Sequence, residues 1–155
     1  MQVEQITAES SIREYVAFRI GGQEFCVDIM SVREIRGWTP ATPLPHAPDY
    51  VRGVINLRGS VLPIVDLARR FGLPLTDPTA RHVIIVAQCG KQTIGILVDA
   101  VSDILTTPAN AMQATPEIAS EVAKTFVRGV HAIDERMISL VTIDNVLPPP
   151  APVAQ

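Results

Sequence analysis

The sequence has little of what a redox, metal or catalytic site requires. Its 155 residues include two cysteines, Cys26 and Cys89, without C-x-x-C spacing, so we expect buried free thiols in a reducing compartment. The histidines His46, His82 and His131 lack metal-ligand spacing, and we interpret each as a solvated or core-edge side chain. No Walker loop, G-x-G-x-x-G or G-x-S-x-G motif occurs. The sequence therefore predicts no cofactor, no metal and no catalytic residue.

Charge and hydropathy argue against two further classes of partner. The formal net charge is −3 and lysine and arginine form no run, so we expect no nucleic-acid binding. The longest uninterrupted apolar runs, such as residues 83–87, are far shorter than a membrane span, and residues 1–11 lack the apolar core of a signal peptide. We expect a cytoplasmic protein without direct membrane insertion.

What the sequence does contain is a repeat. Residues 21–35 resemble residues 90–104, with Val-x-acid-Ile closing both segments, and Val51-Arg52-Gly53-Val54 recurs unchanged at residues 127–130. An apolar segment follows each copy of this motif. A repeated unit of about 70 residues predicts two similar lobes stacked on each other. The cleft between two such lobes would be a natural docking surface.

Glycine-containing turns separate many short apolar segments. Gly21-Gly22 and Gly90-Lys91 are expected to close hairpins, as are residues 58–60 and 134–136. The proline-rich residues 39–48 cannot form a helix or a central strand. We therefore predict an all-β fold of two small five-stranded SH3-like β-barrels packed side by side, with short helical segments.

The sequence also predicts the boundaries of these parts. Residues 1–13 are expected to be a flexible N-terminal segment and residues 148–155 a Pro-rich disordered tail. Between them, one domain over residues 14–147 would hold a first barrel over about 14–80 and a second over about 81–143, and terminal segments could exchange between the lobes. Residues 108–123 have a helical composition interrupted by Pro116, and their role stays open.

A few charged residues stand out from this pattern. Asp66 and Asp99 each end an apolar strand, where capping of the following turn is the ordinary role. Arg58 adjoins a turn glycine between two apolar strands and should project from a rigid hairpin. Glu34 and Asp103 occupy the same place in the two repeats, and each by itself reads as a solvent-facing acid.

Three segments of the sequence resemble a known protein family. Residues 32–35, 51–67 and 95–104 closely resemble the CheW family of bacterial chemotaxis coupling proteins, and the resemblance covers about residues 14–147. It implies two five-stranded barrels with a groove between them and a non-catalytic adaptor. The implied partners are the regulatory domain of the histidine kinase CheA and the cytoplasmic tip of methyl-accepting chemoreceptors, in arrays at the membrane.

The resemblance also implies which residues bind these partners. In the family, partner contacts fall around a Val-x-Glu-Ile strand and an Asn-Leu-Arg-Gly hairpin. Those positions correspond here to Val32, Glu34, Gly53, Asn56, Leu57 and Arg58. Val32 and Leu57 could form the apolar floor of a groove for a receptor helix, with charged groups at its rim. Gly53 would act through backbone space.

Two alternatives stay open. The chain could be a CheW-like adaptor of a parallel chemosensory pathway such as pilus motility, which neighbouring genes would reveal. It could instead be a small β-barrel enzyme or ligand-binding domain, which predicts a deep polar pocket with convergent titratable groups. The adaptor predicts a shallow apolar groove, and weak self-association is compatible with it.

Overall fold

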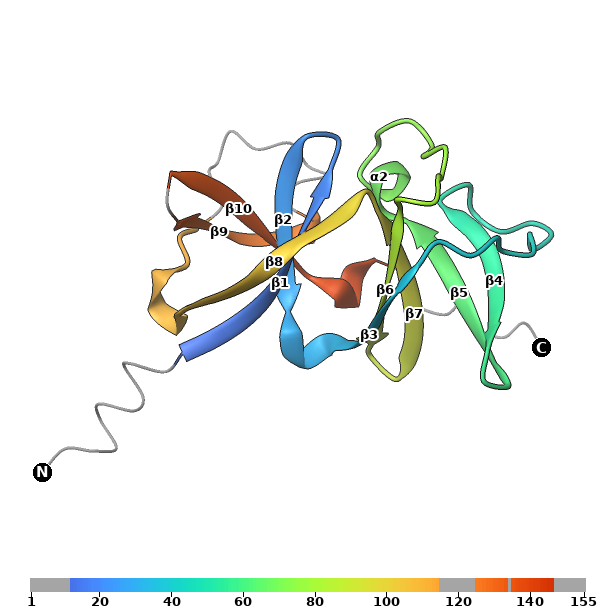
Figure 1. Cartoon of the computed structure of the whole chain (residues 1–155), viewed down its shortest axis with the longest axis horizontal. Helices are drawn as coiled ribbons and strands as arrows, with labels where there is room; N and C mark the ends of the chain where they lie inside the picture. The colour runs from blue at the N-terminus through green and yellow to red at the C-terminus, as the bar shows by residue number, and fades with distance from the viewer. Residues whose placement is uncertain (1–11, 115–124, 134, 147–155) are drawn as a thin grey trace, which may run out of the picture.

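Two five-stranded sheets form the protein, which confirms the predicted all-β fold of two similar halves (Figure 1). The computed structural model describes residues 12–114, 125–133 and 135–146. Lobe 1 contains, in spatial order, β8 (Ala100–Pro108), β1 (Ile12–Ile20), β2 (Gln23–Asp28), β10 (Arg136–Val141) and β9 (Val127–Ile133). Lobe 2 contains β3 (Val32–Gly37), β6 (Val83–Cys89), β7 (Gln92–Val98), β5 (Ser60–Asp66) and β4 (Val51–Leu57).

The short helical segments lie between strands. They are α2 (Leu67–Arg70) and the 3-10 turns η1 (Ile29–Ser31), η2 (Ala109–Ala111) and η3 (Ile143–Asn145). Of the segment 108–123, the structure describes η2 and the residues up to 114, and the rest lies outside the described residues. The predicted lead-in up to residue 11 and the tail 148–155 also lie outside them.

The two lobes do not follow the predicted division of the chain at residue 80. Lobe 1 combines the hairpin β1–β2 of the first repeat with β8, β9 and β10 of the second, and lobe 2 combines β3, β4 and β5 with the hairpin β6–β7. η1 leads the chain from lobe 1 to lobe 2, and Asp99 leads it back. A repeat identifies which strands are alike, but either copy of the hairpin could pair with either set of three strands. The connections decide the pairing, and neither lobe is a continuous stretch of chain.

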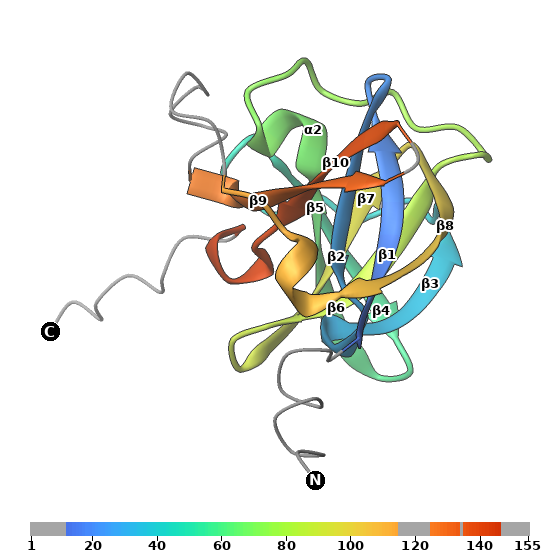
Figure 2. The same ribbon diagram turned by 90° about the vertical axis from the view of Figure 1, so that its left-hand side faces the viewer.

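The two sheets have the same order of equivalent strands. β3 takes the place of β8, β6–β7 that of β1–β2, and β4–β5 that of β9–β10. In each sheet one pair is parallel, β2 with β10 and β7 with β5, and the other three pairs are antiparallel. Seen from the end, lobe 1 stands in front of lobe 2, with β1 and β2 running side by side (Figure 2). The pseudo-symmetry makes a residue in one lobe directly comparable with its counterpart in the other.

Pro63 lies in β5, an internal strand of lobe 2. It pairs with Val54 of β4, and the parallel pairing of β5 with β7 begins one residue later, at Ile64. Pro63 therefore has a local edge position, where β5 has one neighbour. Because proline has no N–H to donate, it is tolerated where one side of the strand needs no ladder bond.

The apolar core has three parts. The largest lies between the lobes, because alternate residues of β1 and β6 point toward the other sheet; it includes Phe18, Val27, Ile85 and Ile96, all buried. Tyr15, Cys26 and Ile138 belong to the interior of lobe 1, and Ile64, Ile84 and Leu97 to that of lobe 2. The facing surfaces of the lobes are thus joined by core packing.

The Val-Arg-Gly-Val motif marks a place where a second segment crosses a strand. Thr42, in the proline-rich segment, exchanges two backbone hydrogen bonds with Val54 of β4, at 2.8 and 2.9 Å. Gly53 has φ +137°, and a Cβ there would lie 2.2 Å from the Thr42 carbonyl oxygen. The proline-rich segment therefore closes over β4 because residue 53 has no side chain.

The second copy of the motif has the same arrangement. Gln113 exchanges two backbone hydrogen bonds of 2.8 Å with Val130 of β9. A Cβ on Gly129 would lie 2.7 Å from the Gln113 carbonyl oxygen and 2.6 Å from Cγ of Met112. The motif recurs unchanged because each lobe needs a glycine at the same crossing.

Cys26 is a buried free thiol, and Cys89 is half-buried and donates a 3.3 Å hydrogen bond to the carbonyl of Ile143. Burial raises the pKa of the Cys26 thiol to about 12, so this side chain stays protonated and acts as a small apolar group.

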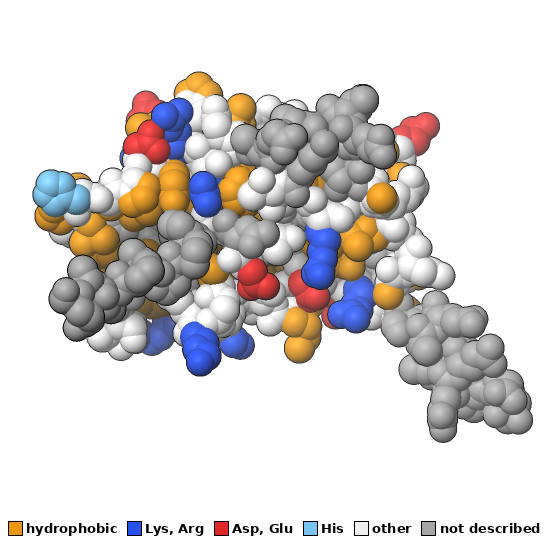
Figure 3. Space-filling model, turned by 180° about the vertical axis from the view of Figure 1, so that it is seen from behind, with side chains coloured by type: hydrophobic (Ala, Val, Ile, Leu, Met, Phe, Trp, Pro, Cys, Tyr) orange, Lys and Arg blue, Asp and Glu red, His pale blue; other side chains and the backbone are white. Residues whose placement is uncertain are grey.

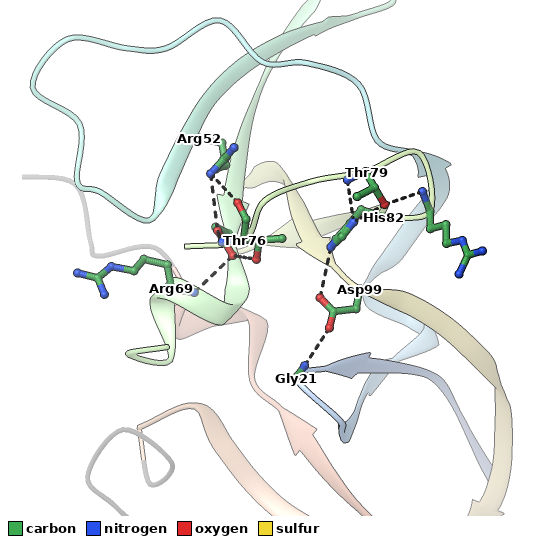
Figure 4. A network of polar contacts seen from close by, with 9 residues as sticks. Gly21, Arg52, Arg69, Thr76, Thr79, His82 and Asp99 are labelled. Carbon is green, nitrogen blue, oxygen red and sulfur yellow. Dashed lines mark hydrogen bonds and ion pairs between the residues drawn. The ribbon is translucent and has the colours of Figure 1, made fainter. Parts of the chain in front are cut away.

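Two carboxylates that end apolar strands accept backbone hydrogen bonds. The predicted capping of the following turn is confirmed for Asp66, whereas Asp99 binds a turn of the other lobe (Figure 4). Asp66 caps α2, and its carboxylate is fully buried. Asp99, between β7 and β8, accepts a 2.9 Å hydrogen bond from the N–H of Gly21, and His82 Nε2 lies 3.6 Å from it. The Gly21 contact joins the β1–β2 turn of lobe 1 to the end of a lobe 2 strand.

The interpretation of His131 as a solvated or core-edge residue is wrong. His131 is fully buried in lobe 1, with its ring 4.9 Å from that of Tyr15, at the position that Ile55 occupies in lobe 2. Neither ring nitrogen has a hydrogen-bond partner among the described residues. Strand alternation turns the side chain inward, and burial lowers the pKa of His131.

We therefore expect acid to destabilise the protein through His131. The unfolded histidine takes up a proton below pH of about 6.5, whereas the buried one resists it, so stability falls as pH decreases through that range. His131→Ile should remove this slope, which is at most about 1.4 kcal/mol per pH unit for one proton. Urea unfolding of both proteins at pH 5 and pH 8 measures it. With His46→Gln, an exposed control, the slope should persist; an unchanged slope in His131→Ile would contradict the expectation.

Candidate functional site

The hairpin between β4 and β5 positions the arginine singled out by the sequence. Its turn has two residues, Arg58 with φ 51° and Gly59 with φ 87°, as a type I′ turn requires. Oδ1 of Asn56 accepts a 2.8 Å hydrogen bond from the N–H of Gly59 and braces the turn. A left-handed conformation costs a residue such as arginine about 1–2 kcal/mol. An arginine held there despite this cost indicates a use for its side chain.

Arg58 reaches across an open seam of lobe 2. Its guanidinium donates a hydrogen bond to the carboxylate of Glu34, on β3, and Arg36 donates a second one at 3.3 Å. β3 and β4 are the two outer strands of this sheet, so the contact joins edges that share no ladder. The hydrogen bond from Arg58, followed by the one from Arg36, lowers the pKa of Glu34. Glu34 therefore stays charged and holds Arg58 in place at neutral pH.

An open hollow lies beneath this ion pair. We call it the seam hollow; its lining includes Glu34, Leu57, Arg58, Val61, Leu62 and Val86. Val61 is 72% exposed, which is unusual for a valine in a strand. Arg58 is also largely exposed. The hollow combines an apolar surface with a charged rim on a braced hairpin, an arrangement that suits docking of another protein.

The structure brings three of the six predicted site residues together. Glu34, Leu57 and Arg58 line the seam hollow, and Asn56 braces the turn beside it. Gly53 is buried beneath Thr42.

Val32 lies apart from the hollow. It packs against the core between the lobes, whereas Leu57 packs against the interior of lobe 2. The expected common apolar floor of these two residues is therefore wrong, because they belong to different apolar clusters.

Sequence reasoning missed Val61 and Arg36. Val61 follows the turn in an unbroken apolar segment, where strand alternation could have marked it as outward-facing next to Leu62. Arg36 stands two residues after Glu34, so both side chains lie on the same face of β3. That spacing was a usable signal for a paired acid.

Lobe 1 has a related cluster at its own seam. Arg136, at the start of β10, donates hydrogen bonds to Glu24 (2.8 Å from Nε) and to Asp103 (3.2 Å), the counterpart of Glu34. Hydrogen bonds from Arg136 lower the pKa of both acids. Ile104 and Met137 are exposed nearby in sequence, as Ile35 and Val61 are in lobe 2. Neither Glu34 nor Asp103 is simply a solvent-facing acid.

The described residues contain neither a metal-binding cluster nor a candidate membrane-spanning helix. In residues 12–114, 125–133 and 135–146, no group of three or more His, Cys, Asp and Glu side chains is placed to hold a metal ion. None of the helices in those ranges has the length and apolarity that crossing a membrane requires.

Comparison with known proteins gives a consistent result. A family model, the CheW-like domain, matches residues 14–149. The chemotaxis protein CheW of Rhizobium meliloti (strain 1021) is 64% identical over 136 residues, 88% of this chain and 88% of that protein. The chemotaxis protein CheW of Klebsiella aerogenes is 37% identical over 145 residues, 94% of this chain and 87% of that protein. The crystal structure of the scaffolding protein TtCheW from Thermoanaerobacter tengcongensis has a TM-score of 0.78 at 28% identity, covering 84% of this chain and 88% of that one.

Proposed function

This chain belongs to the CheW family, and on that premise we propose that it is a non-catalytic adaptor that couples chemoreceptors to the histidine kinase CheA. Its partners are the regulatory domain of the kinase and the cytoplasmic tip of methyl-accepting receptors. The protein works in the cytoplasm, recruited to receptor arrays at the membrane.

The seam hollow is the observation that carries this proposal. Glu34, Leu57 and Arg58 meet there beside the exposed Val61. An apolar surface supplies affinity, while the charged pair at its rim sets the orientation and the rate of association. Because Asn56 braces the hairpin, little freedom is lost when a partner docks.

A reconstituted coupling assay tests the function. The purified chain is mixed with CheA and membrane-embedded receptors from the same cell, and autophosphorylation of CheA is followed with and without attractant. We expect receptor-dependent activation and attractant control to require the chain. Failure to bind either partner would overturn the proposal.

Replacing Arg58 by glycine should separate docking from folding. Arg58→Gly removes the arginine from the charged rim and also relieves the left-handed strain at φ 51°, so the melting temperature should stay equal or rise. We expect Arg58 to be a hot spot, a class of residue enriched in arginine whose loss weakens binding by about 2 kcal/mol or more, roughly 30-fold in the dissociation constant. Titration calorimetry with receptor and kinase fragments measures the loss.

Arg13→Ala is the matched control for this experiment. Arg13 is another exposed arginine in an ion pair, 3.9 Å from Asp28 in lobe 1, and its removal should leave the dissociation constants unchanged. Unaltered binding of both partners by Arg58→Gly would show that the seam hollow is not a docking site.

A further inference from the structure

A second apolar hollow lies at the far end of lobe 2, formed by two loops and β4. We call it the proline hollow; it is lined by Trp38, Pro40, Pro43 and Leu75, with Val51 and Arg52 of β4. Leu75 is 51% exposed, and Leu44 of the same proline-rich segment is 45% exposed. Seen from behind, hydrophobic side chains gather at the left-hand end of the molecule, where β4 and the proline-rich segment lie (Figure 3).

The walls of this hollow are held in place. The N–H of Trp38 donates a 3.0 Å hydrogen bond to the carbonyl of His82, and Thr42 is bonded to Val54 across Gly53. Arg52 donates a 3.1 Å hydrogen bond to the carbonyl of Thr76, next to Leu75, which ties the second loop to β4 (Figure 4). A ligand would therefore meet a preformed surface.

The charged groups at the rim already have partners. Asp49 forms an ion pair with Arg69, 2.7 Å apart, and Arg52 lies 4.0 Å from the buried Asp66 with its guanidinium 5.9 Å from the Trp38 ring. The surface left for a ligand is apolar and aromatic. Such a surface suits an uncharged peptide segment. The docking of proline-rich segments into aromatic-lined grooves is a recurring example of such recognition.

We propose that the proline hollow binds the tail of the same chain, Pro148-Pro149-Pro150-Ala151-Pro152. This segment carries no charged side chain, and its composition favours the polyproline II conformation. Proline-rich segments in this conformation dock into aromatic-lined grooves at little entropic cost, because their backbone is already restricted. The site is thus a polyproline II peptide site, and it does not depend on which partners the seam hollow binds.

A chain of contacts links the end of the described residues to the strand that borders this hollow. The carbonyl of Val146 accepts a 2.6 Å hydrogen bond from Nε of Arg70, whose guanidinium lies 4.4 Å from the Tyr50 ring. Tyr50 stands between Asp49 and Val51, which both line the hollow. Six residues in polyproline II conformation span about 19 Å, at about 3.1 Å per residue. This length exceeds each of the contacts that lead from Val146 through Arg70 to Tyr50, so the proposal requires the tail to continue from there toward Trp38.

Trp38 is the single tryptophan of the chain, so its fluorescence reports on the hollow directly. In a chain that ends at Leu147, we expect emission at longer wavelength and stronger quenching by acrylamide than in the full chain. A full-length variant with Pro148, Pro149, Pro150 and Pro152 replaced by serine should behave like the shortened chain. A synthetic peptide of residues 147–155, added to the shortened chain at millimolar concentration, should restore the original spectrum.

Three results would overturn the proposal. Identical spectra and quenching in the full, shortened and serine-substituted chains would show that the tail does not cover Trp38. A difference that disappears on dilution would mean that the tail binds a second copy. Recovery with a scrambled peptide of the same composition lacking consecutive prolines would exclude polyproline recognition. Circular dichroism and a thermal melt confirm that each variant is folded.

Discussion

Replacing Gly53 by alanine is expected to lower the free energy of unfolding by about 3 kcal/mol, from backbone strain and overpacking together. The added Cβ would lie 2.2 Å from the carbonyl oxygen of Thr42 and 3.0 Å from Cα of Pro43. These are backbone atoms held by the bridge to Val54, so they cannot turn aside as the end of a side chain could. The φ of +137° adds strain for any residue with a Cβ. Urea unfolding at neutral pH measures the loss.

Gly59→Ala is the matched control, because it isolates the strain. Gly59 also has a positive φ, +87°, but a Cβ there meets nothing within 4 Å. Its replacement should cost about 1–2 kcal/mol from conformation alone. Equal losses at the two positions would contradict the crossing as the reason for Gly53. Gly53→Asp should be worse than alanine, since it places a charge beneath the proline-rich segment.

The sequence predicted where the strands lie, but it did not predict which strands pair within one sheet. Gly21-Gly22 and Gly90-Lys91 marked hairpins that the structure contains, because turn chemistry is local. The division near residue 80 failed because pairing is not local. The two hairpins are alike enough that only the routes through η1 and through Asp99 select their partners.

The site was predictable in some of its members but not in its contacts. Arg58 stood out by its place beside a turn glycine, and Glu34 entered through the family resemblance, whereas Val61 and Arg36 were missed. Arg58 and Glu34 meet because the fold of lobe 2 brings β3 toward the β4–β5 turn. No spacing in the sequence encodes this contact. The expectation that Val32 and Leu57 form one apolar floor was wrong for the same reason, because a sequence does not show which distant residues pack together.

The burial of His131 was hidden for a different reason. Residue type predicts average exposure, whereas the register of β9 decides which face this side chain takes. Its alignment with Ile55, directly after the repeated motif, was the signal that could have revealed it.

Removal of the carboxylate of Asp66 is the second large effect. Asp66 is fully buried and accepts hydrogen bonds from the N–H and the hydroxyl of Thr76, at 2.7 and 2.8 Å. Arg52 lies 4.0 Å away (Figure 4). Asp66→Ala leaves these donors unpaired and a half-buried arginine without its acid, so we expect a loss of about 3 kcal/mol in the free energy of unfolding. Chemical denaturation at pH 7 measures it.

The location of the effect distinguishes this explanation from a general loss of stability. Asp66 ties the loop at Thr76 to α2, so the amide of Thr76 should lose its protection from hydrogen exchange while amides of β6 keep theirs under native conditions. Asp28→Ala is the control: it also caps a short helical turn, with a 2.9 Å bond from Met30, but it is partly exposed, so about 1 kcal/mol is expected. Comparable losses for the two aspartates, with Thr76 still protected, would show that burial of Asp66 adds nothing to capping. A large loss confined to Asp66 would instead show that one buried carboxylate holds the wall of the proline hollow, because Thr76 also accepts the hydrogen bond from Arg52.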